Sequence, residues 1–189
     1  MIKFIPGKII EQFKSENEII TFRFPKLSDV KNAMDYVNAI ITEKNSRIMR
    51  TKKVTLSEER KWLKGIIELA KQKIKLPLFI EAKGNIVGTL DIRRSLKPPS
   101  ATDHGAWFGI TLAKSYRGRG IATRSVRTLF KLGKQMWKLR IIKSSYMSDN
   151  SASVALHKKL GFKFAGIIPK DAKYGNKYVD SVILFKELK

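Results

Sequence analysis

Apolar and polar residues recur along the chain with two different periods, and these periods predict an order of strands and helices. Short apolar or alternating runs are typical of strands, whereas apolar residues spaced three or four apart are typical of amphipathic helices. The expected strands are residues 19–24, 76–82, 86–92, 107–112, 139–147, 164–168 and 178–185. The expected helices begin at Ser28 or Asp29, at Thr55, after Gly120 and at Asn150. This order predicts an α/β fold in which helices cover both faces of a mixed sheet.

Local signals support several of these boundaries. Thr55 and Glu58 have the spacing of a capping box, which predicts the start of the second helix. The turn Lys83-Gly84-Asn85 joins two apolar runs and predicts an antiparallel hairpin. The helix after Gly120 has an apolar stripe and is expected to end near Gly133 or one turn later. Loops are expected at residues 93–103 and in the polar segment between the last two strands.

Length and composition indicate one globular domain of 189 residues. Residues 1–20 are expected to form an N-terminal extension and residues 21–189 a single domain. The chain has no cysteine and two histidines, so we expect no disulfide, no cysteine nucleophile and no metal site. The N-terminus lacks the features of a signal peptide and no apolar run is long enough to span a membrane, which favours a cytoplasmic location.

The formal net charge is +23, with 39 basic and 16 acidic side chains. Such a field attracts anions, among them nucleic acids and acidic surfaces, but says little about the fold. The basic residues are spread along the chain rather than clustered, so we expect only non-specific binding to nucleic acid, at low salt.

The segment Tyr116-Arg117-Gly118-Arg119-Gly120-Ile121-Ala122 lies between an apolar run and a helical stretch. It predicts a strand, a glycine turn and a helix start. Such a turn directs several backbone N–H groups outward at the positive end of a helix dipole, beside two arginines. The turn can therefore hold a pyrophosphate, although similar turns also occur in basic proteins without this role.

A second motif lies about thirty residues downstream. Residues 150–162 read as a helix opened by Asn150 and closed by Leu160-Gly161-Phe162. With both motifs the chain resembles the GNAT acetyltransferase family, whose Arg/Gln-x-x-Gly-x-Gly/Ala pattern matches Arg117, Gly120 and Ala122. The segment from Phe22 to Val30 is similar to the first strand and helix start of archaeal members.

The resemblance implies a GNAT fold, with a mixed and mostly antiparallel sheet, and acetyl-CoA as the cofactor. It implies that the strand before the glycine turn diverges from its neighbour and bonds the pantetheine arm, and that the Leu112 N–H stabilises the oxyanion. The implied cofactor-binding residues are Ile110, Thr111, Leu112, Arg117, Gly118, Arg119, Gly120, Ile121, Ala122, Thr123, Asn150 and Ser153. Asn150 also fits an N-cap, and both roles can coexist.

His157 stands where the family often has a tyrosine that protonates the departing thiolate. Asn150, Ser153 and His157 share one helix face, so an imidazolium turned toward the cofactor is one hypothesis and an exposed helix face is the other. With a histidine at this position the chain also resembles the phosphinothricin acetyltransferase branch of the family. It has some likeness to the ribosomal-protein N-terminal acetyltransferase branch as well.

The general base is not identified by the motifs. Trp107 occupies the position where many relatives have a glutamate. His104, Asp91 and Glu81 remain candidates that would act through a water molecule, and the enzyme can also take up an amine that is already neutral.

The resemblance predicts transfer of the acetyl group from acetyl-CoA to a primary amine by direct attack in a ternary complex, since no cysteine is present to carry the acetyl group. Protein N-termini and small amines are the candidate acceptors, and polyamines suit the cationic chain least. The alternative is a catalytically inactive CoA-binding or nucleic-acid-binding module. A homodimer is a family-level expectation.

Overall fold

The computed structural model describes residues 3–43 and 46–188. Its strands form one sheet in the order β1-β2-β3-β4-β5-β6-β8-β7. The strands are β1 (Ile9–Ser15), β2 (Glu18–Arg23), β3 (Lys75–Ala82), β4 (Asn85–Arg93), β5 (Gly105–Leu112), β6 (Ile141–Met147), β7 (Lys163–Tyr174) and β8 (Lys177–Glu187). The helices are α1 (Val30–Thr42), α2 (Leu56–Lys71), α3 (Ile121–Trp137) and α4 (Ser151–Lys159). The predicted α/β class is confirmed.

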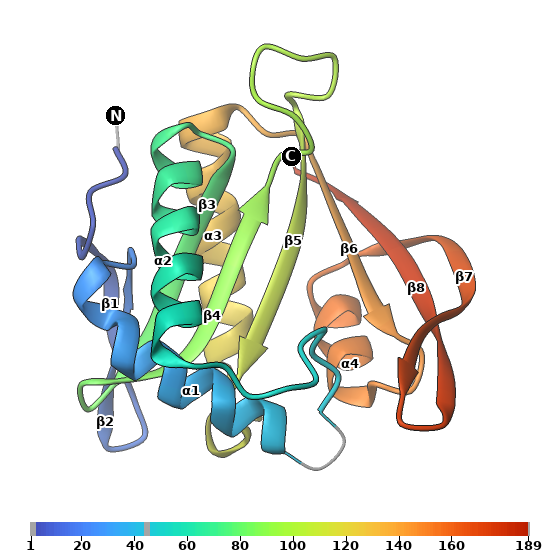
Figure 1. Cartoon of the computed structure of the whole chain (residues 1–189). Helices are drawn as coiled ribbons and strands as arrows, with labels where there is room; N and C mark the ends of the chain where they lie inside the picture. The colour runs from blue at the N-terminus through green and yellow to red at the C-terminus, as the bar shows by residue number, and fades with distance from the viewer. Residues whose placement is uncertain (1–2, 44–45, 189) are drawn as a thin grey trace.

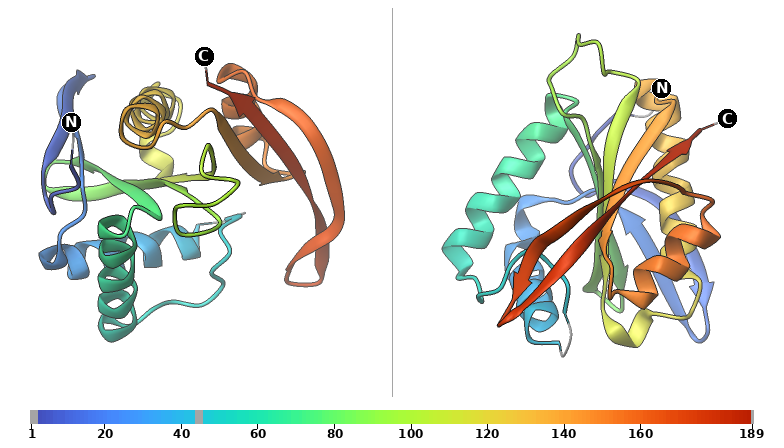
Figure 2. Two further views of the ribbon diagram at one scale, coloured as in Figure 1. Left: turned by 90° about the horizontal axis from the view of Figure 1, so that it is seen from above. Right: turned by 90° about the vertical axis from the view of Figure 1, so that its right-hand side faces the viewer.

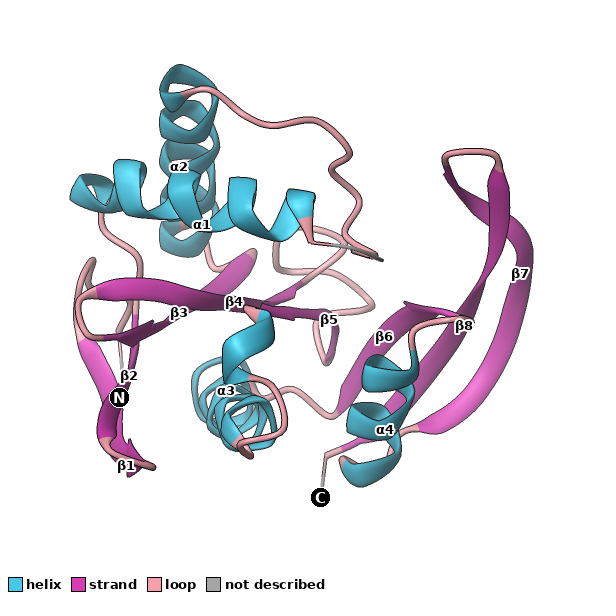
Figure 3. Cartoon of the chain, turned by 90° about the horizontal axis from the view of Figure 1, so that it is seen from below, coloured by secondary structure: helices cyan, strands magenta, loops and turns pink. Residues whose placement is uncertain are grey.

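Helices cover both faces of the sheet. Figure 3 shows α1 and α2 on one face and α3 and α4 on the other. The sheet is mixed because β5 and β6 run parallel, while the other neighbouring strands described are antiparallel. Seen from above, the sheet twists strongly, so the β7–β8 hairpin projects away from α3 (Figure 2).

The alternation of side chains along the central strands divides the core into two clusters. Leu78 and Ile80 of β3 face α3, whereas Phe79 between them faces α1 and α2. All three are at most 1% exposed. None of the described helices combines the length and the apolar composition needed to cross a membrane.

Residues 9–15 and 18–19, which precede position 20, belong to strands of the sheet. The boundary expected at residue 20 falls inside β2, and β1 pairs with β2 from Ile9↔Arg23 to Ser15↔Glu18. The Phe13 and Phe22 rings lie 5.3 Å apart. Residues 9–15 therefore form an edge strand of the sheet.

Local predictions are confirmed at one helix start and corrected at another. Thr55 and Glu58 form the expected capping box. Asp29 precedes α1 but makes no side-chain cap, because its carboxylate pairs with Arg23 (2.8 Å) and accepts from the Lys26 N–H. The polar segment expected as a loop after residue 168 is also corrected, since β7 continues to Tyr174 and pairs there with β8.

Candidate active site

The site begins where β5 and β6 separate. These strands pair only from Gly105↔Ile141 to Trp107↔Lys143, and beyond this point they diverge into a V that is visible in Figure 1. The predicted divergence of the strand before the glycine turn is thus present. Beyond Trp107, the backbone N–H and C=O groups of β5 on the side of β6 have no strand to pair with and face the opening of the V.

The strand pattern identifies which backbone groups these are. Ala113 donates its N–H to Val87 of β4. Successive residues of a strand direct their backbone N–H and C=O groups to opposite edges. The backbone groups of Thr111 therefore point toward β4, as those of Ala113 do, and the backbone groups of Ile110 and Leu112 face the V. The Leu112 carbonyl accepts from Arg117 Nε at 2.7 Å. The Ile110 and Leu112 N–H groups are therefore available to a ligand, while Thr111 contributes its side chain instead.

The glycine turn lies directly after β5 and starts α3. Gly118 and Gly120 have φ values of +79° and +75°, in the left-handed region that favours glycine. A Cβ atom at either position would meet nothing within 4 Å, so the backbone there is open to a ligand. Among the hydrogen bonds of the described residues, none uses the N–H of Gly118 or Gly120. These exposed donors at the start of α3 fit a pyrophosphate.

A cavity of about 350 Å³ extends from this turn into the V. It brings together all but one of the expected cofactor-binding residues. They are Ile110, Thr111, Leu112, Arg117, Gly118, Gly120, Ile121, Ala122, Thr123, Asn150 and Ser153. Asn150 also accepts the Ser153 N–H at 3.1 Å and so caps α4, as expected. The sequence motifs thus mark the walls of one cavity.

The two arginines of the turn differ from expectation. The side chain of Arg119 does not line the cavity, because it bonds to Glu18 (2.7 Å) near the β1–β2 turn. Arg117 does line the cavity, where its guanidinium pairs with Glu43 at 2.6 Å. Both guanidiniums are therefore paired with carboxylates, whereas the backbone N–H groups of Gly118 and Gly120 have no partner among the described residues.

One wall of the cavity comes from α1 and the connection that follows it, which the sequence analysis missed. This wall consists of Ile40, Glu43, Ser46, Arg47 and Ile48. Arg47 forms two hydrogen bonds with Asp149 (2.8 and 2.7 Å), the residue before Asn150. The Ser46 hydroxyl is buried without a partner among the described residues, so it can bond a ligand. Arg47 and Asp149 are 102 residues apart in the sequence, so no local motif could have predicted this contact.

His157 lies behind the cavity rather than in it, which corrects the expected cofactor-facing position. The side chain is 3% exposed and packs against the rings of Phe108, Tyr146 and Phe162. Nδ1 donates to the Ser153 carbonyl at 2.8 Å, so Nε2 accepts from the Ser144 hydroxyl, also at 2.8 Å. Burial lowers the pKa of His157, although the bond to Ser153 opposes the shift. The neutral ring therefore connects α4 to β6.

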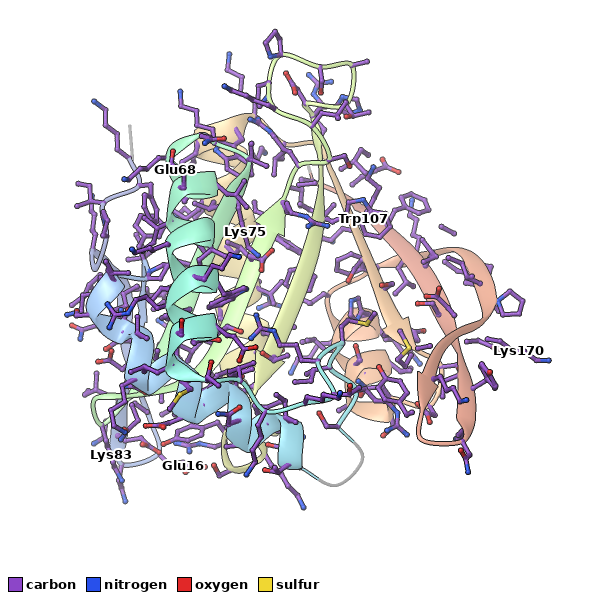
Figure 4. The ribbon with its side chains drawn as sticks, viewed as in Figure 1. Glu16, Glu68, Lys75, Lys83, Trp107 and Lys170 are labelled. Carbon is purple, nitrogen blue, oxygen red and sulfur yellow. The ribbon has the colours of Figure 1, made fainter. Side chains whose placement is uncertain are left out.

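The candidate bases are also placed outside the cavities. Trp107, labelled in Figure 4, lies on β5 with Lys143 Nζ 5.6 Å from its ring centre. Asp91 pairs with Lys75 at 2.9 Å and Glu81 accepts from Arg23 at 2.7 Å. His104 precedes β5, at the end of the strand far from the glycine turn. None of these four residues lines the cavity at the V.

A second, smaller cavity meets the first at Thr111. Its volume is about 160 Å³, and it lies between α1, α2 and the strands β4 and β5. Ile40, Ile48 and Thr111 line both cavities. The two cavities therefore adjoin each other beside β5.

Comparison with known proteins agrees with this arrangement. The acetyltransferase (GNAT) family model matches residues 43–162, which is more than half of the chain. The structure superimposes on the RimL ribosomal L7/L12 alpha-N-protein acetyltransferase in complex with coenzyme A, with a TM-score of 0.80 at 19% identity over 96% of this chain and 98% of that one. For YncA from Salmonella typhimurium, a putative acetyltransferase with its cofactor acetyl-CoA, the TM-score is 0.73 at 17% identity over 90% and 94%.

Among curated proteins, the L-amino acid N-acetyltransferase AaaT of Escherichia coli (strain K12) is 29% identical over 98 residues, which are 52% of this chain and 59% of AaaT. The probable N-acetyltransferase YjcK of Bacillus subtilis (strain 168) is 27% identical over 57% of this chain and 58% of its own length. The chain thus matches less than two thirds of each relative. The chain belongs to the GNAT acetyltransferase family, and its fold is the GNAT fold.

Proposed function

We propose that the chain is an acetyl-CoA-dependent N-acetyltransferase that transfers the acetyl group to a primary amine by direct attack in a ternary complex. The observation that carries the proposal is the open V, in which free backbone donors of β5 lie beside the exposed N–H groups of the glycine turn. The chain's membership of the GNAT family supports it. When bound, acetyl-CoA would supply a thioester as the acetyl donor.

The position of each residue in the cavity suggests its role in the reaction. The N–H groups at Gly118 and Gly120 would hold the pyrophosphate, and the backbone of β5 that faces the V would bond the pantetheine arm. The Leu112 N–H faces the V and would stabilise the oxyanion that forms when an amine attacks the thioester. Asn150 and Ser153 form the opposite wall. These positions align the two reactants, which is the main requirement of a direct transfer.

The acceptor is proposed to be an α-amine. Glu43 and Glu59, the carboxylates that line the two cavities, are paired with Arg117 and Arg50, so neither is a free base among the described residues. The α-amine of a peptide N-terminus, with a pKa of about 7.7 to 8.0, is partly neutral at pH 7.5, whereas a lysine amine with a pKa of about 10.4 is almost fully protonated. The names of AaaT and RimL, which refer to an L-amino acid and an alpha-N-protein position, are consistent with this choice.

Titration calorimetry with acetyl-CoA at moderate salt tests the proposal. The Gly120→Glu variant places bulk and negative charge at the proposed pyrophosphate position, so we expect saturable binding by the wild type and a loss of at least about 100-fold in the variant.

Gly84→Glu is the matched control. Gly84 has the same φ of +75°, a Cβ there also meets nothing within 4 Å, and it lies in the β3–β4 turn. Equal affinity in all three proteins would mean that the glycine turn is only structural.

A further inference from the structure

The second cavity is lined by apolar side chains together with a few polar ones. Its apolar side chains come from α1, α2 and the connection between them. They are Ala33, Val37, Ile40, Ile48, Met49 and Trp62. At about 160 Å³ the cavity is well below the roughly 300 Å³ at which pockets for drug-sized ligands begin, so it suits a single side chain.

The polar groups of this cavity bond to each other. The Tyr36 hydroxyl donates to Thr111 Oγ1 at 3.0 Å, and Thr111 Oγ1 lies 3.0 Å from Thr89 Oγ1. Glu59 is 2% exposed and accepts from Arg50 at 3.1 Å. A group entering the cavity therefore finds apolar surface and no unpaired charge among its described lining residues.

The second cavity lies next to the proposed position of the acetyl group. Thr111 lies between Ile110 and Leu112, the two residues whose backbone N–H groups face the V. An α-amine placed at Thr111 therefore reaches the open edge of β5 while its own side chain extends between α1 and α2. The side chain of the acceptor, rather than its charge, would be recognised there.

We propose that this cavity selects acceptors whose α-amine lies next to an apolar side chain of the size of leucine, methionine or phenylalanine. The inference rests on the proposed acetyltransferase function and specifies its substrate class. A free amino acid and the first residue of a peptide share this chemistry. A polyamine is disfavoured because Glu59, the carboxylate that lines the cavity, is already paired with Arg50.

Release of CoA with a panel of acceptors tests the selection. The panel contains the amides of glycine, leucine, methionine and phenylalanine, spermidine, and tripeptides that begin with glycine or methionine. We expect kcat/KM to be at least about tenfold higher for each apolar amide than for glycinamide, because a single methylene in an apolar pocket changes this ratio by about 10 to 200-fold. The peptides identify whether amino acids or protein N-termini are the better source of the amine.

Two variants connect the preference to the cavity. Trp62→Ala removes an apolar wall, and Met49→Ser changes a rim residue that is 78% exposed and so has little effect on folding. Both should reduce the preference for methioninamide over glycinamide by about fivefold or more, with acetyl-CoA affinity unchanged within about twofold. Trp107→Ala is the control, since Trp107 lies outside both cavities.

The outcomes separate the inference from the proposed function. Equal kcat/KM for glycinamide and the apolar amides, a preference for spermidine, or equal effects of Trp62→Ala and Trp107→Ala would overturn the inference while acetyl transfer persists. Saturable acetyl-CoA binding with no transfer to any apolar amide would overturn it as well. Absence of saturable acetyl-CoA binding would overturn the proposed function itself.

Discussion

At the scale of single residues, the environment of a side chain decides its chemistry more than its type does. His157 has the spacing of a catalytic acid, yet it is buried and bonds to Ser153 and Ser144. Ser144 follows Lys143, which is part of the last pair between β5 and β6, and its hydroxyl also lies 3.2 Å from the Phe108 carbonyl. His157 therefore supports the point where the V opens.

Replacement of His157 by Phe tests this interpretation. The variant leaves the Ser153 carbonyl and the buried Ser144 hydroxyl without the imidazole, so we expect a loss of about 1 to 3 kcal/mol in the free energy of unfolding. Tm would fall by about 2 to 4 °C for each kcal/mol, and kcat per folded molecule would stay within about twofold of the wild type. A tenfold lower kcat with unchanged Tm would support an acid role instead.

The pH dependence of stability supplies a second measurement on the same variant. Burial lowers the pKa of His157 in the folded state, whereas the unfolded histidine keeps a pKa of about 6.5. Below about pH 6.5 the unfolded state binds the additional proton, so the stability that the neutral ring provides is lost as the pH falls. Between pH 7.5 and 5.5 the Tm of the wild type should therefore decrease more than that of His157→Phe.

At the scale of secondary-structure elements, the connection between α1 and α2 completes the cavity at the V. The Arg47 guanidinium links it to Asp149, and the Tyr174 hydroxyl donates to the Arg47 carbonyl at 3.2 Å. Arg47 and Lys177 hold the pKa of Asp149 well below its usual range, so this link persists at neutral pH. Three segments far apart in the sequence are thereby linked beside the cavity.

Replacement of Arg47 by Met removes this link but retains an unbranched side chain. Since Ser46 and Ile48 also line the cavity, we expect acetyl-CoA to bind about 3 to 10-fold more weakly, in line with roughly 1 kcal/mol for a partly buried ion pair. The control is Lys31→Met, which breaks the exposed Lys31–Asp35 pair. Calorimetry that gives equal Kd values for Arg47→Met and the wild type would exclude a contribution of the connection to the cavity.

At the scale of the whole molecule, the charge is positive overall, whereas the arginines at the cavities are paired with carboxylates. These pairs are Arg47 with Asp149, Arg50 with Glu59 and Arg117 with Glu43. Elsewhere the excess of lysine is exposed, for example at Lys170 on the β7–β8 hairpin and Lys83 on the β3–β4 turn (Figure 4). The field of the molecule thus attracts anions, while the guanidiniums at the cavities are neutralised locally.

This distribution predicts different salt dependences for two ligands. Binding of a single-stranded DNA 20-mer should weaken by at least about tenfold between roughly 50 and 200 mM NaCl, because it depends on released counterions. The affinity for acetyl-CoA should fall less over the same range, because at the proposed site its phosphates would contact fixed backbone donors. Fluorescence anisotropy and calorimetry at both salt concentrations measure the two effects. A DNA affinity that resists salt would indicate a specific nucleic-acid site.

The sequence by itself determined the features that depend on neighbouring residues. The Thr55–Glu58 capping box, the Lys83-Gly84-Asn85 turn and the left-handed Gly120 are local, because each involves contacts or dihedral angles within a few positions. Side-chain periodicity likewise indicated the apolar stripe of α3, which is buried. For this reason the fold class and most of the cofactor cavity could be predicted.

Only the tertiary structure decided how polar side chains pair across the fold. Arg119 turned away from the cavity because Glu18, 101 residues distant, is its partner. His157 became buried because α4 packs on β6 and β5, and the second cavity exists because α1 and α2 meet the sheet beside Thr111. These outcomes depend on which distant segments become neighbours, and neither periodicity nor local motifs carry that information.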